Sequence, residues 1–139
     1  MNKKELYLLR FGALQTMGMA VYHFFLPTQF GWSNHIPESL ATISWALLML
    51  NNSFSFNLFI LSGFLMYFAF NRQRNTQTLL VLTAAVLAFW IFSAVYQIAV
   101  PMPLPERLEW IGMLLPAVAV LNAAILAVPT RVLWKLRKT

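Results

Sequence analysis

The sequence contains no cysteine and no aspartate, and these two absences exclude several kinds of chemistry. Without cysteine there is no thiolate nucleophile, no disulfide exchange, and no Cys-ligated zinc or iron–sulfur cluster. Without aspartate there is no Ser–His–Asp triad. The acids are Glu5, Glu38, Glu106 and Glu109, all near a chain end or in an expected loop. Paired carboxylates for acid–base catalysis are therefore missing, and no P-loop or GxGxxG motif occurs.

Charged residues are also scarce: they make up 10% of the 139 residues, whereas hydrophobic residues make up 60%. An average soluble domain has about 25% charged residues, so this chain cannot build a polar shell, and lipid is its expected solvent. The net charge of +6 does not indicate nucleic-acid binding, because the basic residues lie at the chain ends and in one short loop. Their expected partner is the anionic surface of the lipid bilayer.

Four apolar stretches predict an all-α, polytopic membrane protein, built as a four-helix transmembrane bundle in a single domain over residues 1–139. Pro27 and Pro129 are expected to end the first and the fourth span, because proline lacks an N–H group. Pro101, Pro103 and Pro105 predict a stiff extended connector ahead of the fourth. The spans are expected at residues 8–26, 54–70, 79–100 and 108–128.

The stretch from Leu40 to Phe70 is longer than one span needs. It would form about 46 Å of helix, against a hydrocarbon core of about 30 Å. Its middle is the polar run Asn51–Asn52–Ser53. Either one long tilted helix leaves the membrane on the outside, or a short interfacial helix over Ser39–Leu50 precedes a span that Asn52 or Ser53 caps. The second arrangement is the preferred prediction.

The basic residues predict the orientation of the chain. Except for Arg107, all of them fall at the start of the first span, in the loop between the second and third, or after the fourth. This bias places those segments in the cytoplasm, which requires an even number of spans. We therefore expect a multi-pass protein of the plasma (inner) membrane with both termini cytoplasmic. The residues concerned are Lys3, Lys4, Arg10, Arg72, Arg74, Arg131, Lys135, Arg137 and Lys138.

Polar side chains at one depth predict a candidate binding site. In the expected orientation they fall in the outer half of three different spans, where they could line an outward-facing pocket. His23 is expected at its centre, because a histidine can titrate near neutral pH, ligate a metal or haem, or hydrogen-bond a ligand headgroup. The candidate ligand-binding residues are Tyr22, His23, Asn52, Asn57, Tyr96 and Gln97, with Asn51 at the same depth.

A second interpretation gives His23 a structural role, in which it donates a hydrogen bond to Asn57 or Tyr96 and fastens the bundle. A metal site is not expected, because it needs three or more ligands, and His35 and Glu38 lie on a loop. A bis-histidine haem would need a second embedded histidine. The sequence therefore predicts no metal and no cofactor.

Small residues recur at helical spacing and predict close packing. Gly12 and Thr16 share a face of the first span with His23, and Ala119, Ala123 and Ala127 follow each other at four-residue intervals in the fourth. The leading hypothesis is therefore a non-enzymatic accessory or scaffolding subunit, whose small faces pack against a membrane-protein partner or against a second copy. The alternative is binding or transport of a small or lipid-like molecule in the pocket around His23. A membrane enzyme ranks third, because the acid–base inventory is so thin.

The runs Gly18–Phe25 (GMAVYHFF), Phe30–Gly31–Trp32 and Leu50–Asn51–Asn52 resemble a set of small uncharacterised four-helix bacterial membrane proteins that are DoxX-like in layout. The resemblance covers roughly residues 8 to 70, and it implies a four-helix bundle with no established activity. DoxX-type proteins are associated with oxidoreductase partners, but the cysteines of their thiol-active relatives are absent here. Small multidrug exporters are similar in size and span count, yet the glutamate of their first span has no counterpart in Leu8–Leu26.

Overall fold

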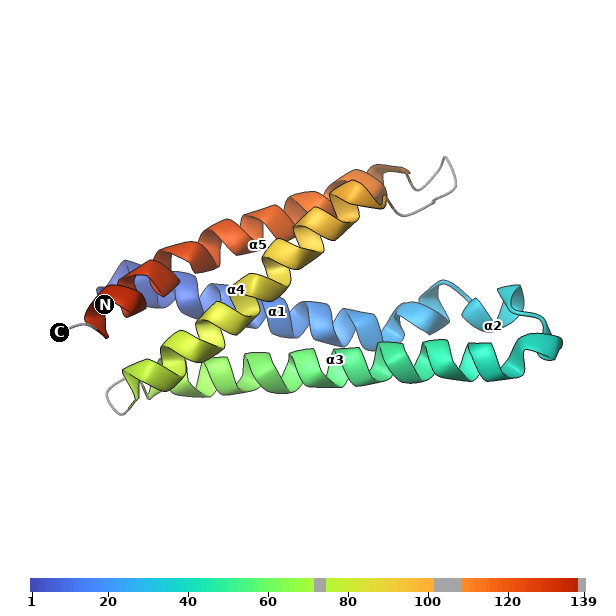
Figure 1. The fold of residues 1–139 in the computed structure, drawn as a ribbon, viewed down its shortest axis with the longest axis horizontal. Coiled ribbons are helices and arrows are strands. Elements are labelled where there is room, and N and C mark those ends of the chain that lie inside the picture. Colours follow the sequence, from blue (N-terminus) through green and yellow to red (C-terminus); the bar gives the residue numbers. More distant parts are fainter. Residues whose placement is uncertain (72–74, 102–108, 138–139) are drawn as a thin grey trace.

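A computed structural model of the chain describes residues 1–71, 75–101 and 109–137, and every element within these ranges is a helix (Figure 1). This confirms the all-α class for the described part. The expectations for residues 72–74, 102–108 and 138–139, among them most of the proline-rich connector and Arg107, lie outside it. In chain order the elements are α1 (Lys3–Gln29), α2 (Trp32–His35), the 3₁₀ turn η1 (Glu38–Leu40), α3 (Ala41–Phe70), α4 (Thr76–Ala99) and α5 (Glu109–Leu136).

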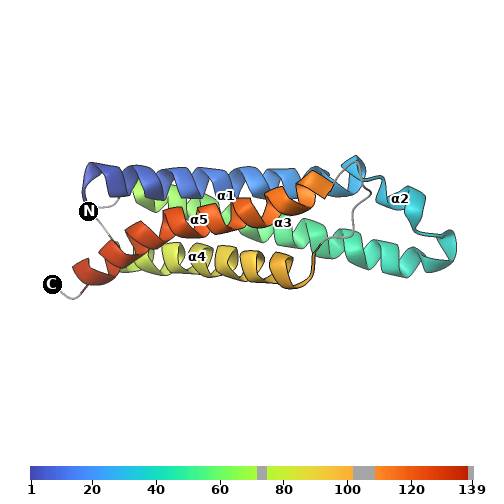
Figure 2. The ribbon, with the colours of Figure 1, turned by 90° about the horizontal axis from the view of Figure 1, so that it is seen from above.

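Three of the described helices are long and apolar enough to cross a membrane: Glu38–Phe70, α4 and α5. Helix α1 is not among them, although it has 27 residues, about 40 Å at about 1.5 Å per residue. Gln15, Thr16, Tyr22 and His23 interrupt its apolar sequence. The helix nevertheless lies beside α3 along most of its length (Figures 1 and 2).

The helices form two antiparallel pairs, α1 with α3 and α4 with α5. Helix α1 also packs on α5, and α3 on α4. The α4–α5 pair crosses the α1–α3 pair obliquely, so the two pairs diverge toward the end away from the termini (Figure 1). At the closed end, the Arg10 guanidinium lies 4.0 Å from the centre of the Phe70 ring and donates a hydrogen bond to the Ala69 carbonyl at 3.3 Å.

Side-chain caps explain where two of the helices begin. Asn2 and Glu5 form a capping box on α1, in which Asn2 Oδ1 accepts from the Glu5 N–H at 2.9 Å and Glu5 Oε2 accepts from the Asn2 N–H at 2.6 Å. Asn75 caps α4 by accepting from the Thr78 N–H at 3.0 Å. Both caps satisfy N–H groups that a helix leaves unpaired at its start.

The expectation that Pro27 and Pro129 end their helices is wrong. Helix α1 continues to Gln29 and α5 to Leu136, so both prolines lie inside a helix. A proline in a helix leaves the carbonyl four residues earlier without its partner, which for Pro27 is the carbonyl of His23. The Asn51 side chain of α3 donates to that carbonyl at 2.7 Å, which restores the missing bond from a neighbouring helix.

The preferred break in the long second stretch is also wrong, because α3 is continuous from Ala41 to Phe70 and only the turn η1 precedes it. Its 30 residues give about 45 Å of helix. The polar residues of its middle do not interrupt it, because their side chains bond within the helix or to α1. Ser55 Oγ donates to the Asn51 carbonyl at 2.7 Å, and Asn57 Nδ2 donates to the Ser53 carbonyl at 2.9 Å.

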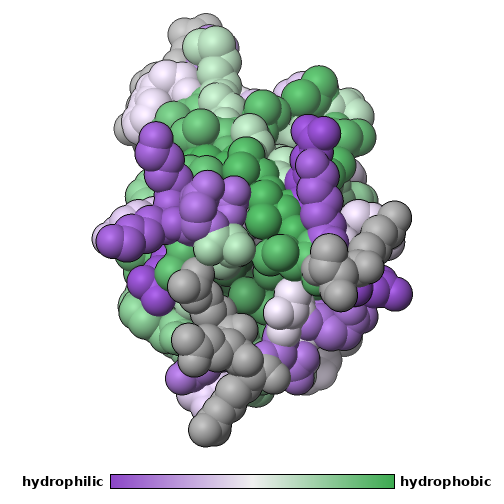
Figure 3. Space-filling model, turned by 90° about the vertical axis from the view of Figure 1, so that its left-hand side faces the viewer, coloured by the Kyte–Doolittle hydropathy of each residue, from purple (hydrophilic) through white to green (hydrophobic). Residues whose placement is uncertain are grey.

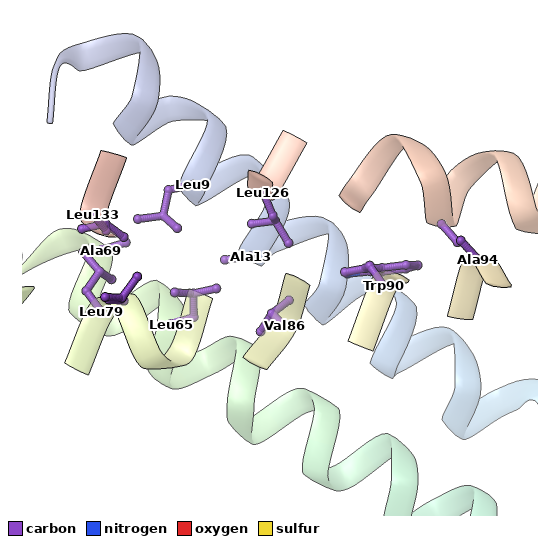
Figure 4. Packing of buried hydrophobic residues seen from close by; sticks show 12 residues of the cluster. Leu9, Ala13, Leu65, Ala69, Leu79, Val86, Trp90, Ala94, Leu126 and Leu133 are labelled. Atoms are coloured by element: carbon purple, nitrogen blue, oxygen red, sulfur yellow. The ribbon is translucent and has the colours of Figure 1, made fainter. Parts of the chain in front are cut away.

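The buried core lies where the two pairs meet, around Leu9, Leu65, Leu126 and Trp90 (Figure 4). Trp90 is its largest fully buried side chain, and its indole Nε1 donates to Thr16 Oγ1 at 2.9 Å. The Thr16 hydroxyl in turn donates to the Gly12 carbonyl at 2.7 Å. Core packing and one polar chain thus tie α4 to α1.

Candidate functional site

A cavity of about 200 Å³ lies between the two helix pairs, on the side where they diverge. Each of the four long helices contributes to its wall. Its lining is mostly apolar and aromatic, with a few polar side chains between them. The lining residues are Met19, Tyr22, His23, Leu26, Phe30, Leu58, Phe89, Trp90, Ser93, Gln97, Ile111 and Leu115.

Helical spacing explains why these side chains meet. On α1 the lining residues begin at Met19 and recur at i+3, i+4 and i+7, which is a single helix face. On α4, Trp90, Ser93 and Gln97 follow at i, i+3 and i+7, and α5 adds Ile111 and Leu115. The cavity is therefore built from one face of each helix, and the divergence of the pairs leaves it unfilled.

His23 lies in an aromatic wall that joins three helices. Its ring makes edge contacts with Tyr22 at 5.9 Å and with Phe54 of α3 at 5.2 Å between centroids. Phe54 in turn packs on Phe89 of α4 at 5.6 Å, and Phe89 on Trp90 at 5.2 Å. Offset and edge-on ring pairs of this kind stabilise packing by about 0.5–1.5 kcal/mol each. The wall gives the imidazole a fixed position beside the cavity.

Gln97 presents an unused acceptor. Its Nε2 donates to the Ser93 hydroxyl at 2.7 Å, one turn earlier on α4. Its Oε1 is buried and has no hydrogen-bond partner among the residues that the structure describes. Of the residues that line the cavity, none carries an acidic, lysine or arginine side chain within the described ranges. The site is thus electrically neutral unless His23 is protonated.

The structure brings together half of the candidate residues. Tyr22, His23 and Gln97 line the cavity. The other three lie outside it: Asn52 is exposed, Asn57 bonds to its own helix, and Tyr96 is exposed and stacks on Phe92 at 5.9 Å. The interhelical bond near His23 is formed by Asn51, which donates to the His23 carbonyl, and not by Asn57 or Tyr96.

Several lining residues were not among the sequence-based candidates, notably Ser93, Trp90 and Leu115. The spacing of Trp90, Ser93 and Gln97 along α4 was the signal available for the first two. The contribution of α5 left no such signal, because Ile111 and Leu115 are ordinary apolar residues of a helix that is apolar over most of its length.

Within residues 1–71, 75–101 and 109–137, no three His or Glu side chains come together to hold a metal ion. Comparison of the chain with protein-family models, with curated proteins and with solved structures gives no match. The resemblance to the DoxX-like group therefore stays a prediction, and the cavity is the feature from which a function can be inferred.

Proposed function

We propose that this chain is a four-span membrane protein, with both termini in the cytoplasm, that binds a small molecule in the cavity between its helix pairs. The observation that carries the proposal is the cavity itself. It gathers His23, Tyr22, Ser93 and Gln97 among apolar walls where close packing would be expected.

The surface supports placement in a bilayer. Large apolar side chains such as Phe11, Phe64, Phe92 and Leu121 are exposed on all four long helices, which lipid would cover. Both termini lie at the same end of the molecule (Figure 1). Seen from that end, hydrophilic residues surround an apolar centre (Figure 3). An even number of crossings explains this arrangement, and α1 supplies the fourth.

The charges of the described residues support the orientation. Lys3, Lys4 and Arg10 open α1, and Arg131, Lys135 and Arg137 close α5, which places all of them toward the end that holds the termini. The acids Glu38 and Glu109 lie toward the other end. The positive-inside rule then puts the termini in the cytoplasm and the cavity in the outer half of the membrane.

Native mass spectrometry of the protein, gently extracted from its own membrane, tests ligand binding. We expect a stoichiometric small-molecule adduct on the wild type. His23→Ala and Leu115→Trp should lose it, the first by removing a polar wall and the second by filling the cavity. Asn57→Ala is the matched control, because Asn57 is at a similar depth but outside the cavity, and it should keep the adduct. A wild type without any adduct would overturn the proposal.

The accessory-subunit hypothesis remains a second proposal, but on a different surface. Gly12 and Ala119 are buried within the chain, so the small-residue faces pack mainly internally, with only Ala127 exposed. The first three turns of α3 are instead apolar on all sides and exposed. They carry Leu40, Ile43, Trp45, Leu47, Leu48, Met49 and Leu50.

A helix that is apolar all round is normally covered, and this part of α3 extends beyond α1 toward the end away from the termini (Figure 1). A membrane-protein partner or a second copy would cover it. The same mass spectra test this idea, because a defined complex should dissociate in Leu47→Lys and persist in Asn57→Ala. A wild type that is strictly monomeric would contradict it.

A further inference from the structure

The cavity also constrains what it holds, and this step rests on the proposed function. We infer that its ligand is a neutral aromatic ring that carries a hydroxyl group, of the phenol class, whose O–H donates to Gln97 Oε1. Four observations lead to this class: the charge of the lining, its aromatic content, its volume and the unused acceptor.

Charge excludes most metabolites. None of the described lining residues is an acid, a lysine or an arginine, so a carboxylate, phosphate or ammonium ligand would enter without a counter-ion. An isolated charge in an apolar site costs several kcal/mol or more. The ligand is therefore neutral.

Shape and volume indicate a single ring. Tyr22, His23, Phe30, Phe89 and Trp90 all line the cavity, and flat aromatic walls favour a flat ligand. A cavity of roughly 150 Å³ in another protein holds benzene, so the volume of about 200 Å³ here holds one ring with a short substituent. Any longer chain on the ring would have to leave through the mouth of the cavity.

The Gln97 side chain specifies the substituent. Its Nε2 is engaged by Ser93, which orients the amide, and its Oε1 is left as a buried acceptor without a partner in the described chain. A buried acceptor without a partner costs about 1–3 kcal/mol, which a ligand donor would recover. An ether or a carbonyl cannot donate, whereas a hydroxyl can. The site should therefore prefer a phenol to an ether of the same ring.

The test compares three probes of similar shape: 4-fluorophenol, 4-fluoroanisole and 4-fluorotoluene. Their binding to the protein in lipid nanodiscs is followed by fluorine NMR. Leu115→Trp, which fills the cavity, gives the baseline for partition into lipid. We expect the wild type to bind the phenol at least about tenfold more tightly than the ether, since one hydrogen bond of about 1.4 kcal/mol gives that factor. Gln97→Leu should reduce the ratio to about one, while Asn57→Leu should leave it unchanged.

The probe series in the wild type needs no variant, so a Gln97→Leu protein that fails to fold leaves the test intact. Equal binding of phenol and ether in the wild type would overturn the inference, and so would binding at the Leu115→Trp baseline. Competition by 4-dodecylphenol separates two sources of the ring. Displacement of the fluorophenol would assign it to a lipid-borne headgroup, and no displacement would assign it to a free solute.

The two proposals fail in different ways. A native adduct without selectivity for the phenol would leave ligand binding in place and remove only the phenol class. Selective phenol binding by a protein that carries no adduct in its own membrane would remove the proposed function and leave the chemistry of the cavity.

Discussion

Pro27 and Asn51 lie on different helices, but both act on the carbonyl oxygen of His23. The proline withholds the N–H that would bond to it within α1, and the asparagine of α3 supplies a donor at 2.7 Å. Each residue is poorly suited to a membrane helix alone, since one breaks the hydrogen-bond ladder and the other carries a polar amide. Together they leave the carbonyl satisfied, which is the requirement that lipid places on backbone atoms.

A double-mutant cycle measures this dependence. Asn51→Leu removes the donor, and it should lower the free energy of unfolding by about 0.6–1.7 kcal/mol, the range found for interhelical hydrogen bonds in membranes. In a Pro27→Ala background the same change should cost close to nothing, because the new backbone N–H at position 27 can bond to the His23 carbonyl. Unfolding in mixed micelles by titration with a denaturing detergent gives the four values.

Asn52→Leu is the control for that cycle, because Asn52 is exposed on the same helix and should change stability by less than about 0.5 kcal/mol. If Asn51→Leu cost the same with and without the proline, the two residues would be independent and Asn51 would have no compensating role.

The candidate site could be predicted at this scale only in part, for a physical reason. Depth in the membrane follows from position along a span, and it placed Tyr22, His23 and Gln97 correctly near the cavity. The direction around the helix axis did not follow for Asn57 and Tyr96. In helices that are apolar on every side, hydrophobicity does not mark the buried face, and an amide can satisfy itself on its own helix, as Asn57 does.

Among the helices, a very close approach joins α1 and α5 at Gly12. A methyl group added there would lie 2.6 Å from Leu126 Cδ2 and 2.8 Å from Leu126 Cγ. Leu126 is fully buried and has little room to move. Gly12 therefore sets the distance between the two pairs at their closed end, as small residues do in membrane helix packing.

Gly12→Ala should destabilise the fold despite the better helix propensity of alanine. Overpacking costs about 1–3 kcal/mol, and the gain in propensity is about 1 kcal/mol, so a net loss of about 1 kcal/mol is expected. Gly18→Ala is the matched control on the same helix: the added methyl group meets no described atom within 4 Å, and the change should be neutral or stabilising. Unfolding curves of the two variants decide, and a loss that is equal in both would contradict the role of Gly12.

The helices themselves were largely predictable, and their ends were not. Each expected span lies within a helix over its described residues, because long apolar runs have few alternatives. The wrong predictions arise where one residue type is considered in isolation. Pro27 alone predicts a helix end, and Asn51–Asn52–Ser53 alone predicts a break, whereas contact between α1 and α3 makes Asn51 the compensation for Pro27. A tertiary contact of this kind leaves no local signal.

For the whole molecule, the absence of cysteine makes the orientation directly measurable. Ser33→Cys places a thiol near the end away from the termini, and Lys135→Cys places one near the C-terminus; both positions are exposed. In cells with an intact plasma membrane, an impermeant maleimide should label position 33 and reach position 135 only after permeabilisation. The reverse pattern would invert the topology, and labelling of both positions in intact cells would exclude an even number of crossings.

The relative arrangement of the two helix pairs was beyond the sequence. Span count and charge place four helices in order, but neither indicates that α4 and α5 lean away from α1 and α3 at one end. That divergence depends on which side chains meet at the crossing, with Gly12 against Leu126 and Trp90 against Thr16. The cavity exists because of it, so the volume of the site could not be predicted even where its residues could.

The polarity of α1 also has a consequence for how the protein is made. In the proposed membrane orientation, α1 leaves the ribosome first, yet it is the least hydrophobic of the four segments and carries a carbonyl that only Asn51 satisfies. A translocon sorts each segment by its own preference for lipid, and α1 alone would be held back. Its partner α3 follows directly in the chain and pairs with it along most of its length. Insertion of the first half as a joined hairpin, rather than helix by helix, follows from that order.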